Sequence, residues 1–196
     1  LTDEPGPALQ DFLNLFNECL SLRIFPDAWL LSQVSMIFKK NDPASCDNYR
    51  PISLLAIAYK FFASMLKERL LASGLDAKLW SSQFGFRKHR STYDAIFVAR
   101  RRIELACAQR NGRLSLLALD WSKAFDSIHL ESLHDAMRRI GLPGCMTDII
   151  MALMRKRNFY VEDSGSSSQQ RPQRSGITQG CTLSPLLFVV LMTVLM

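Results

Sequence analysis

The chain of 196 residues is 48% hydrophobic and 21% charged, which argues against disorder and allows one sizeable core or two small ones. Its five cysteines include no C-x-x-C pair, which argues against a disulfide framework or a zinc site. A net charge of +6 suggests an anionic partner, the alternative being a merely soluble surface, and the uneven distribution of the basic residues favours the partner. The segment from Thr2 to Pro7 is polar and acidic, so no signal peptide is predicted, and the longest apolar stretch, residues 186–196, is shorter than a membrane span of about 20 residues.

The first part of the chain alternates between apolar periodic segments and polar ones. The pattern predicts a helix, a strand, a polar loop, a short extended segment and a second helix that ends at Gly74. In order, these segments are residues 8–24, 33–38, 39–50, 51–55 and 56–73. The loop carries two basic residues at its entrance.

The second part begins with a basic loop and a helix that Ser91 or Thr92 can cap. An apolar strand, two helices, a hairpin and a tight loop follow, and Ser184-Pro185 can start a last helix. In order, the segments before that last helix are residues 81–90, 92–110, 114–119, 130–140, 143–157, 158–174 (turning at 164–165) and 176–180. Helices and strands are mixed without steady βαβ alternation, so the predicted fold class is α+β. Neither G-x-G-x-x-G nor a P-loop motif occurs.

Asp120 closes the apolar run from Leu114 to Leu119. A run of this length predicts a buried strand, and a carboxylate at its end needs a cation or several hydrogen-bond donors. Magnesium is held by one or two carboxylates together with substrate phosphates, so Asp120 is a candidate metal ligand. The alternative is that Asp120 simply caps the next turn.

Four segments narrow this choice when they are taken together. They are Asn48-Tyr49-Arg50-Pro51-Ile52-Ser53-Leu54-Leu55, Gln83-Phe84-Gly85-Phe86-Arg87-Lys88-His89-Arg90-Ser91-Thr92, Leu119-Asp120-Trp121-Ser122-Lys123-Ala124-Phe125-Asp126 and Gly176-Ile177-Thr178-Gln179-Gly180-Cys181-Thr182-Leu183-Ser184-Pro185. In this order and spacing they closely resemble the reverse transcriptase domain of non-LTR retrotransposons. The likeness extends from about Phe38 to about Phe188.

The resemblance implies a right-hand polymerase of which fingers and palm are present here. It implies RNA-directed DNA polymerisation by two-metal nucleotidyl transfer with Mg²⁺. It places Asp120 as the catalytic metal ligand and the backbone carbonyl of Trp121 against the second metal. Phe125 is placed under the sugar of the incoming nucleotide, where it selects deoxynucleotides, although core packing is the commoner role of Phe. Asp126 is interpreted as a turn or helix-cap residue.

The same resemblance implies roles for the basic residues and for the tight loop of residues 176–180. Gln179 and Gly180 resemble the loop that packs on the nascent base pair and nucleotide, the alternative being a plain turn. Arg50 and Lys60 are expected to clamp the triphosphate or template. The loop with interleaved aromatic and basic side chains is expected to contact the template through Phe86, Arg87, Lys88 and Arg90. The Arg100-Arg101-Arg102 run is either a similar contact or an exposed helix face.

The chain departs from the family pattern in one respect. The family's other two metal-binding aspartates lie in a Tyr/Phe-x-Asp-Asp hairpin beyond the Ser184-Pro185 helix, and no Asp follows Asp163 here. Leu1 is no initiating Met, and the last residues are apolar. We therefore expect a chain truncated before the second catalytic hairpin and thumb. Residues 1–112 are then a fingers-like region with an N-terminal helix and residues 113–196 a partial palm. This fragment alone is expected to be inactive, with weak or absent Mg²⁺ binding.

The polymerase interpretation predicts one cleft at the end of a central strand. Asp120, Phe125 and Gln179 should line it, with Arg50 and Lys60 facing it. The implied partners are an RNA template, a DNA primer and dNTPs, with no membrane, and the family implies a nuclear or cytoplasmic location. The alternative function is that of a catalytically dead nucleic-acid-binding remnant.

Overall fold

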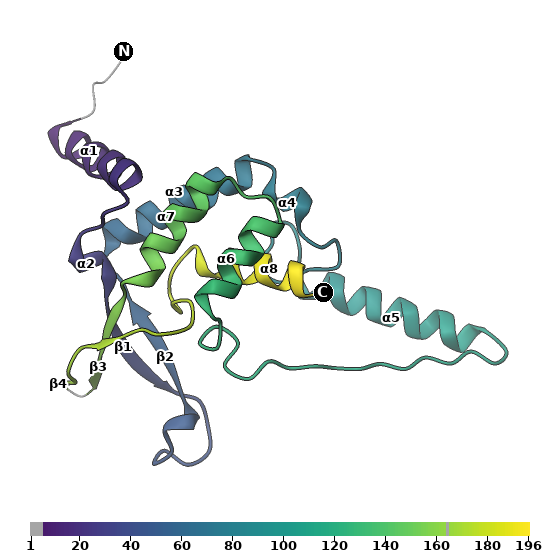
Figure 1. Ribbon diagram of the computed structural model, residues 1–196. Helices are drawn as coiled ribbons and strands as arrows, with labels where there is room; N and C mark the ends of the chain where they lie inside the picture. Colours follow the sequence, from purple (N-terminus) through teal and green to yellow (C-terminus); the bar gives the residue numbers. More distant parts are fainter. Residues whose placement is uncertain (1–5, 164) are drawn as a thin grey trace.

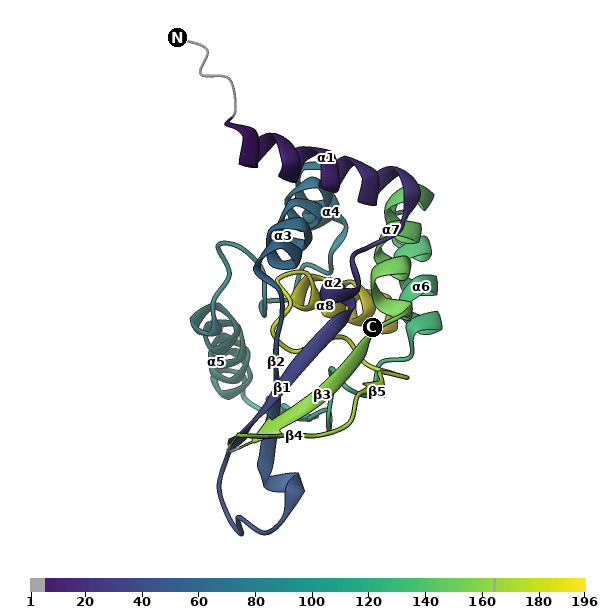
Figure 2. The ribbon, with the colours of Figure 1, turned by 90° about the vertical axis from the view of Figure 1, so that its left-hand side faces the viewer.

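One sheet of five strands lies at one end of the molecule, as the computed structural model shows (Figure 1). The structure describes residues 6–163 and 165–196, so most of the polar segment at Thr2 to Pro7 and Ser164 of the predicted turn lie outside it. The strands are β1 (Leu31–Phe38), β2 (Tyr49–Leu54), β3 (Asn158–Asp163), β4 (Ser166–Ser167) and β5 (Arg171–Pro172). β1 lies between β2, to which it is antiparallel, and β3, to which it is parallel (Figure 2).

The helices lie beyond the sheet, and most of them pack together and enclose most of the core (Figure 1). They are α1 (Pro7–Leu22), α2 (Asp27–Leu30), α3 (Ile57–Ala72), α4 (Leu75–Lys78), α5 (Thr92–Ala108), α6 (Leu130–Arg139), α7 (Gly144–Arg155) and α8 (Ser184–Leu195), with a 3₁₀ turn at Cys46–Asn48. α8 is apolar on all sides, which is typical of a helix buried all round. Leu187 and Val190 of α8 are fully buried, as are Phe62 and Leu66 of α3. The core therefore joins segments from both halves of the sequence.

Most predicted elements are confirmed. The predicted ranges agree to within a few residues for α1 and α3, for β1 and β2, for α6 and α7, for the hairpin and for α8. Ser91 caps α5 in a capping box, in which its side chain accepts from the Asp94 backbone N–H and the Asp94 carboxylate accepts from the Ser91 backbone. No helix in the described ranges is long and apolar enough to cross a membrane.

The strand predicted before Asp120 is wrong. Residues 112–121 follow α5 as an irregular segment that runs back toward α6 (Figure 1). Within residues 6–163 and 165–196, no other segment hydrogen-bonds to the backbone of residues 113–121. A strand exists only where a neighbour completes its hydrogen-bond ladder, so apolar composition alone did not produce one. Leu116, Leu117 and Leu119 are consequently 74–80% exposed.

α5 likewise has no buried residue. Its aromatic and aliphatic side chains, among them Tyr93 and Phe97, are exposed. The three arginines of its middle turn lie on the solvated surface, where Arg100 and Arg101 both pair with Glu104. Because α5 buries little apolar surface, tertiary packing stabilises it little. Its capping box and the ion pairs between its own side chains therefore support the helix.

Candidate functional site

The loop of residues 173–181 is hydrogen-bonded to the segment of residues 125–128. The backbone N–H of Ile177 donates to the carbonyl of Phe125 at 2.9 Å, and that of Gly176 donates to the carbonyl of Ile128 at 2.7 Å. The Ser175 hydroxyl donates to the carbonyl of Asp126 at 3.2 Å. The third and fourth motifs are thus brought together although about 50 residues separate them.

The same loop is hydrogen-bonded to β2, which carries the first motif. The backbone N–H of Ser53 donates to the carbonyl of Gln179 at 2.8 Å. Gly180 has a φ of +118°, and a Cβ placed on it would lie 2.4 Å from the Ser53 carbonyl oxygen. Gly176 has a φ of +84°, and its Cβ would lie 2.8 Å from the Asp126 Cα. Only glycine combines this backbone conformation with such close approach, which is why these two positions are glycines.

Asp126 is the residue whose importance the sequence analysis missed. Its carboxylate oxygens accept from the Gln179 side-chain amide at 3.0 and 3.1 Å. The sequence pattern predicted only a turn or helix-cap role for Asp126. Its backbone does take part in the turn of residues 122–127, but its side chain reaches the distant loop. The sequence did contain a signal for this role, namely a second acidic residue six positions after Asp120 in the same motif.

Phe125 lies at the edge of the core. Its ring stacks on Phe188 of α8 with centroids 5.0 Å apart, and it meets Phe86 edge-on at 6.1 Å. Phe125 is half-buried, while Phe86 is 60% exposed and has a φ of +59°. The ring of Phe125 is therefore only partly covered by its two aromatic neighbours, and it is not sealed inside the core.

A groove of about 360 Å³ lies between the sheet and the loop. Its lining includes Asp126, Gln179, Arg174 and, on β2, Pro51 and Ser53. Side chains alternate between the two faces of a strand, so Arg50, which precedes Pro51, belongs to the opposite face. The predicted cleft is therefore not this groove. Of the five residues predicted to face one cleft, only Gln179 lines the groove, and Asp120, Phe125, Arg50 and Lys60 are not among its lining residues.

Asp120 and Trp121 lie on the irregular segment and are exposed. Across residues 6–163 and 165–196, no three His, Cys, Asp or Glu side chains are grouped as metal ligands. The structure does not place Asp120 at the end of a central strand. A single exposed carboxylate gives a divalent cation few ligands, so the described residues by themselves do not fit a two-metal centre.

Lys60 and its neighbour Tyr59 connect α3 to the end of the loop. Lys60 is half-buried, and its carbonyl is 3.5 Å from the Thr182 hydroxyl. The Tyr59 hydroxyl is 3.0 Å from the Cys181 Sγ and accepts from Nη1 of Arg157 at 2.9 Å. Burial, the largest cause, raises the pKa of Tyr59. The loop thus ends against a buried polar group that the sequence analysis did not identify.

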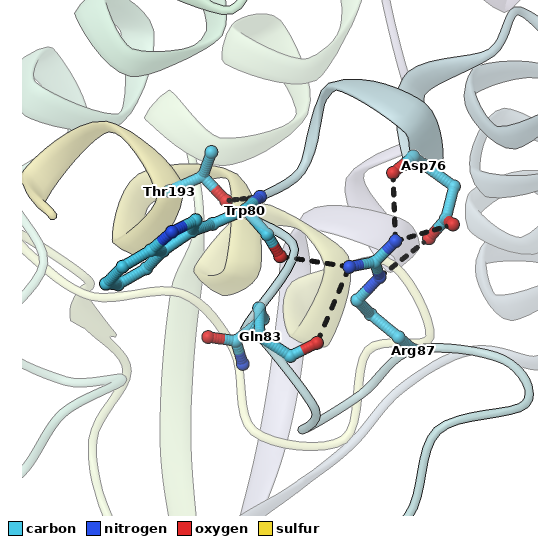
Figure 3. A network of polar contacts seen from close by, with 5 residues as sticks. All are labelled: Asp76, Trp80, Gln83, Arg87 and Thr193. Atoms are coloured by element: carbon cyan, nitrogen blue, oxygen red, sulfur yellow. Dashed lines mark hydrogen bonds and ion pairs between the residues drawn. The ribbon is translucent and has the colours of Figure 1, made fainter. Parts of the chain in front are cut away.

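Arg87 is a structural residue of the basic loop. Its guanidinium donates to both carboxylate oxygens of Asp76, at 3.0 and 2.7 Å, and to the carbonyls of Asp76 and Trp80, each at 3.0 Å (Figure 3). The Arg87 side chain is only 7% exposed. The prediction of a template contact does not fit this geometry, because the donors of Arg87 are used within the protein.

The remaining basic residues of this loop are free to meet a ligand. Lys88 and Arg90 are exposed, and the Arg90 guanidinium carbon lies 5.7 Å from the centroid of the Phe84 ring. Together with exposed Phe86, they present positive charge beside an aromatic surface. Such a combination is typical of proteins that bind single-stranded nucleic acid.

We expect Arg87→Ala to lower the free energy of unfolding by about 2–3 kcal/mol, because several acceptors lose their donor at once. The hydrogen bond from Arg87 lowers the pKa of Asp76. A lowered folded-state pKa contributes stability that is fully present above the unfolded carboxyl pKa of about 4 and is lost as the pH falls below it. The difference between wild type and variant should therefore shrink below about pH 4 in urea unfolding. Lys88→Ala is the control, and equal stabilities of Arg87→Ala and Lys88→Ala at neutral pH would contradict this role.

Comparison with known proteins identifies relatives over nearly the whole chain. The family model described as reverse transcriptase (RNA-dependent DNA polymerase) matches residues 37–196. The chain is 31% identical over 191 residues to "RNA-directed DNA polymerase from mobile element jockey" of Drosophila melanogaster, covering 95% of this chain and 20% of that protein. It is 28% identical over 178 residues to "Probable RNA-directed DNA polymerase from transposon BS" of the same species, covering 90% of this chain and 19% of that protein.

A further relative comes from another kind of element. The chain is 31% identical over 176 residues to "Retrovirus-related Pol polyprotein from type-1 retrotransposable element R2" of Nasonia vitripennis, covering 89% of this chain and 17% of that protein. The chain spans about a fifth of the length of the relatives that it matches.

Proposed function

Because the chain belongs to the reverse transcriptase family, we propose that it forms the nucleotide-binding and template-binding part of an RNA-directed DNA polymerase of a non-LTR retroelement. The observation that carries this proposal is the joining of three family motifs at one place. The loop at Gln179 is hydrogen-bonded both to the Phe125 segment and to β2. In the proposed arrangement, residues 1–112 are a fingers-like region and residues 113–196 form part of the palm.

The proposed roles follow from what each side chain can do. Phe125, with its half-buried ring, lies under the sugar and disfavours a 2′-hydroxyl by its bulk. Gln179 and Gly180 contact the nucleotide from the loop. Arg50 is exposed on β2 and, with the ammonium of Lys60, provides positive charge for phosphates. The proposed partners are an RNA template, a DNA primer and deoxynucleotides.

Reverse transcriptases generally use divalent metal ions, which activate the attacking hydroxyl and stabilise the leaving pyrophosphate. We propose Asp120 as the carboxylate that this chain supplies for Mg²⁺, with the backbone carbonyl of Trp121 beside it. Because no three acidic, His or Cys side chains are grouped in the described ranges, Asp120 needs further ligands before it can hold such an ion. A nuclear or cytoplasmic location is part of the same proposal, on family grounds.

The isolated chain is expected to show no primer extension. Its described residues supply no group of carboxylates at Asp120, and a lone ligand holds a divalent cation weakly. The assay is dTTP incorporation on poly(rA)/oligo(dT) with Mg²⁺ or Mn²⁺. Template-dependent incorporation above that of an Asp120→Ala control would show that this expectation is wrong.

Binding of an RNA/DNA hybrid with a single-stranded RNA overhang tests the proposed function itself. We expect affinity to fall steeply as salt rises, because released counterions supply much of the binding free energy. The double variant Lys88→Ala/Arg90→Ala should bind more weakly and lower the slope of log affinity against log salt by about one for each phosphate that is no longer neutralised.

The matched control removes two exposed charges from another element, helix α6. Arg138→Ala/Arg139→Ala on α6 has the same change in net charge and should bind like wild type. Fluorescence anisotropy at several salt concentrations gives both affinities and slopes. No binding at low salt, or equal losses in the two double variants, would argue against template contact at the basic loop.

The alternative function, a catalytically dead nucleic-acid-binding remnant, shares this binding surface. It differs in the nucleotide site, since a remnant that only binds nucleic acid has no need of a dNTP. Binding of dTTP by the chain therefore favours the polymerase origin of the Phe125 and Gln179 segments. Measuring dTTP binding therefore distinguishes the polymerase interpretation from the remnant interpretation.

A further inference from the structure

The orientation of the Gln179 amide is fixed by the chemistry of its partner. A side-chain amide has a donor end and an acceptor end, and an ionised carboxylate only accepts. The end that lies 3.0 and 3.1 Å from the two Asp126 oxygens must therefore be the NH₂ group. The carbonyl oxygen Oε1 points away from Asp126, and in the described part of the chain no residue donates a hydrogen bond to it.

The carboxylate that orients Gln179 is itself held in place. The Asp126 backbone N–H donates to the carbonyl of Lys123 at 2.9 Å, and its carbonyl accepts from the Ser175 hydroxyl. Gly176 packs directly against its Cα. Asp126 is half-buried, and among the residues that the structure describes it forms no ion pair with a cation. Both hydrogen bonds that its carboxylate accepts come from Gln179, so the residue acts through that amide.

We propose that Asp126 is a positioning residue that holds Gln179 so that Oε1 accepts a hydrogen bond from a bound deoxynucleotide. The proposal rests on the proposed nucleotide-binding function of the Gln179 loop. Without Asp126 the amide can rotate and present either end, so part of the binding free energy is lost in ordering it. Asn at position 126 keeps an acceptor for the Gln179 amide and should largely preserve the orientation.

The test is a titration of the 196-residue chain with dTTP and Mg²⁺, followed in ¹H–¹⁵N spectra that also show the Gln179 side-chain amide. Asp126→Ala should weaken dTTP binding about tenfold, the effect of one charge-assisted hydrogen bond. Asp126→Asn should bind within about threefold of wild type, because an amide oxygen replaces the carboxylate as acceptor. In a Gln179→Ala background, Asp126→Ala should have no additional effect.

Two further measurements distinguish a positioning role of Asp126 from a purely structural one. In wild type the Gln179 amide signals should move as the Asp126 carboxylate is protonated, and in Asp126→Asn they should not. Asp11→Ala removes an equal charge from exposed α1 and should match wild type in dTTP binding. An additional loss from Asp126→Ala in the Gln179→Ala background would overturn the proposal, and so would wild-type affinity in Asp126→Ala. Wild-type chain that binds no dTTP at all would instead overturn the proposed function, and the role of Asp126 with it.

Discussion

Gly180→Ala is expected to separate the loop from β2 and to lower the free energy of unfolding by about 2–4 kcal/mol. Two causes act together at this position. A φ of +118° is strained for any residue with a Cβ, and that Cβ would lie 2.4 Å from the Ser53 carbonyl oxygen. The neighbouring hydrogen bond from Ser53 to Gln179 would be disturbed by any shift that relieves the clash. Binding of dTTP should be lost along with stability.

Gly74→Ala separates the effect of the backbone conformation from that of the contact. Gly74 also has a positive φ, of +83°, but no atom lies within 4 Å of the position that its Cβ would take. The substitution should cost only about 1 kcal/mol, the strain of the left-handed conformation. Urea unfolding of both variants measures the difference. Equal losses would show that the contact between Gly180 and β2 adds nothing to the stability.

Arg157→Ala is expected to lower the free energy of unfolding by about 3 kcal/mol, whereas Arg157→Met should leave it unchanged or raise it. Arg157 is only 2% exposed, and its Nε and Nη2 have no hydrogen-bond partner in the described structure. Its guanidinium carbon lies 4.9 Å from the centroid of the Tyr59 ring. The side chain therefore fills volume and contacts an aromatic ring, while none of the described carboxylates pairs with its charge.

The pair of substitutions distinguishes volume from charge. Alanine leaves a cavity beside Tyr59 and Cys181, while methionine fills much of it without burying a charge. Thermal unfolding of the two variants gives the comparison. If methionine destabilises as much as alanine, the cation–π contact and the hydrogen bond to Tyr59 outweigh the desolvation of the guanidinium.

Local signals in the sequence predicted the local structure well. The capping box at Ser91 and the glycine after α3 define helix ends, and both depend only on residues within one turn. The apolar run before Asp120 shows the limit of such reasoning. Its composition suits a strand, but a strand also needs a hydrogen-bonding neighbour, which no pattern within the run can specify.

The candidate site was predictable in its motifs and not in its contacts. The likeness of four segments identified Phe125 and Gln179, and the structure places their segments side by side. The roles of Asp126 and Arg87 depend on partners 53 and 11 residues away, Gln179 and Asp76. The face to which Arg50 belongs depends on the register of β2 against β1, which pairs Arg50 with Ile37. Tertiary packing determines the roles of Asp126 and Arg87 and the face of Arg50, so residue type alone could not predict them.

A crystal structure of the chain with dTTP and Mg²⁺ tests the central claim most directly. The claim is that the Phe125 segment and the Gln179 loop together form the nucleotide site of a reverse transcriptase. The account predicts that the sugar of dTTP lies against the Phe125 ring and that the Gln179 Oε1 accepts a hydrogen bond from the nucleotide, with Nε2 still on Asp126. A nucleotide ordered elsewhere on the surface, away from both residues, would contradict it.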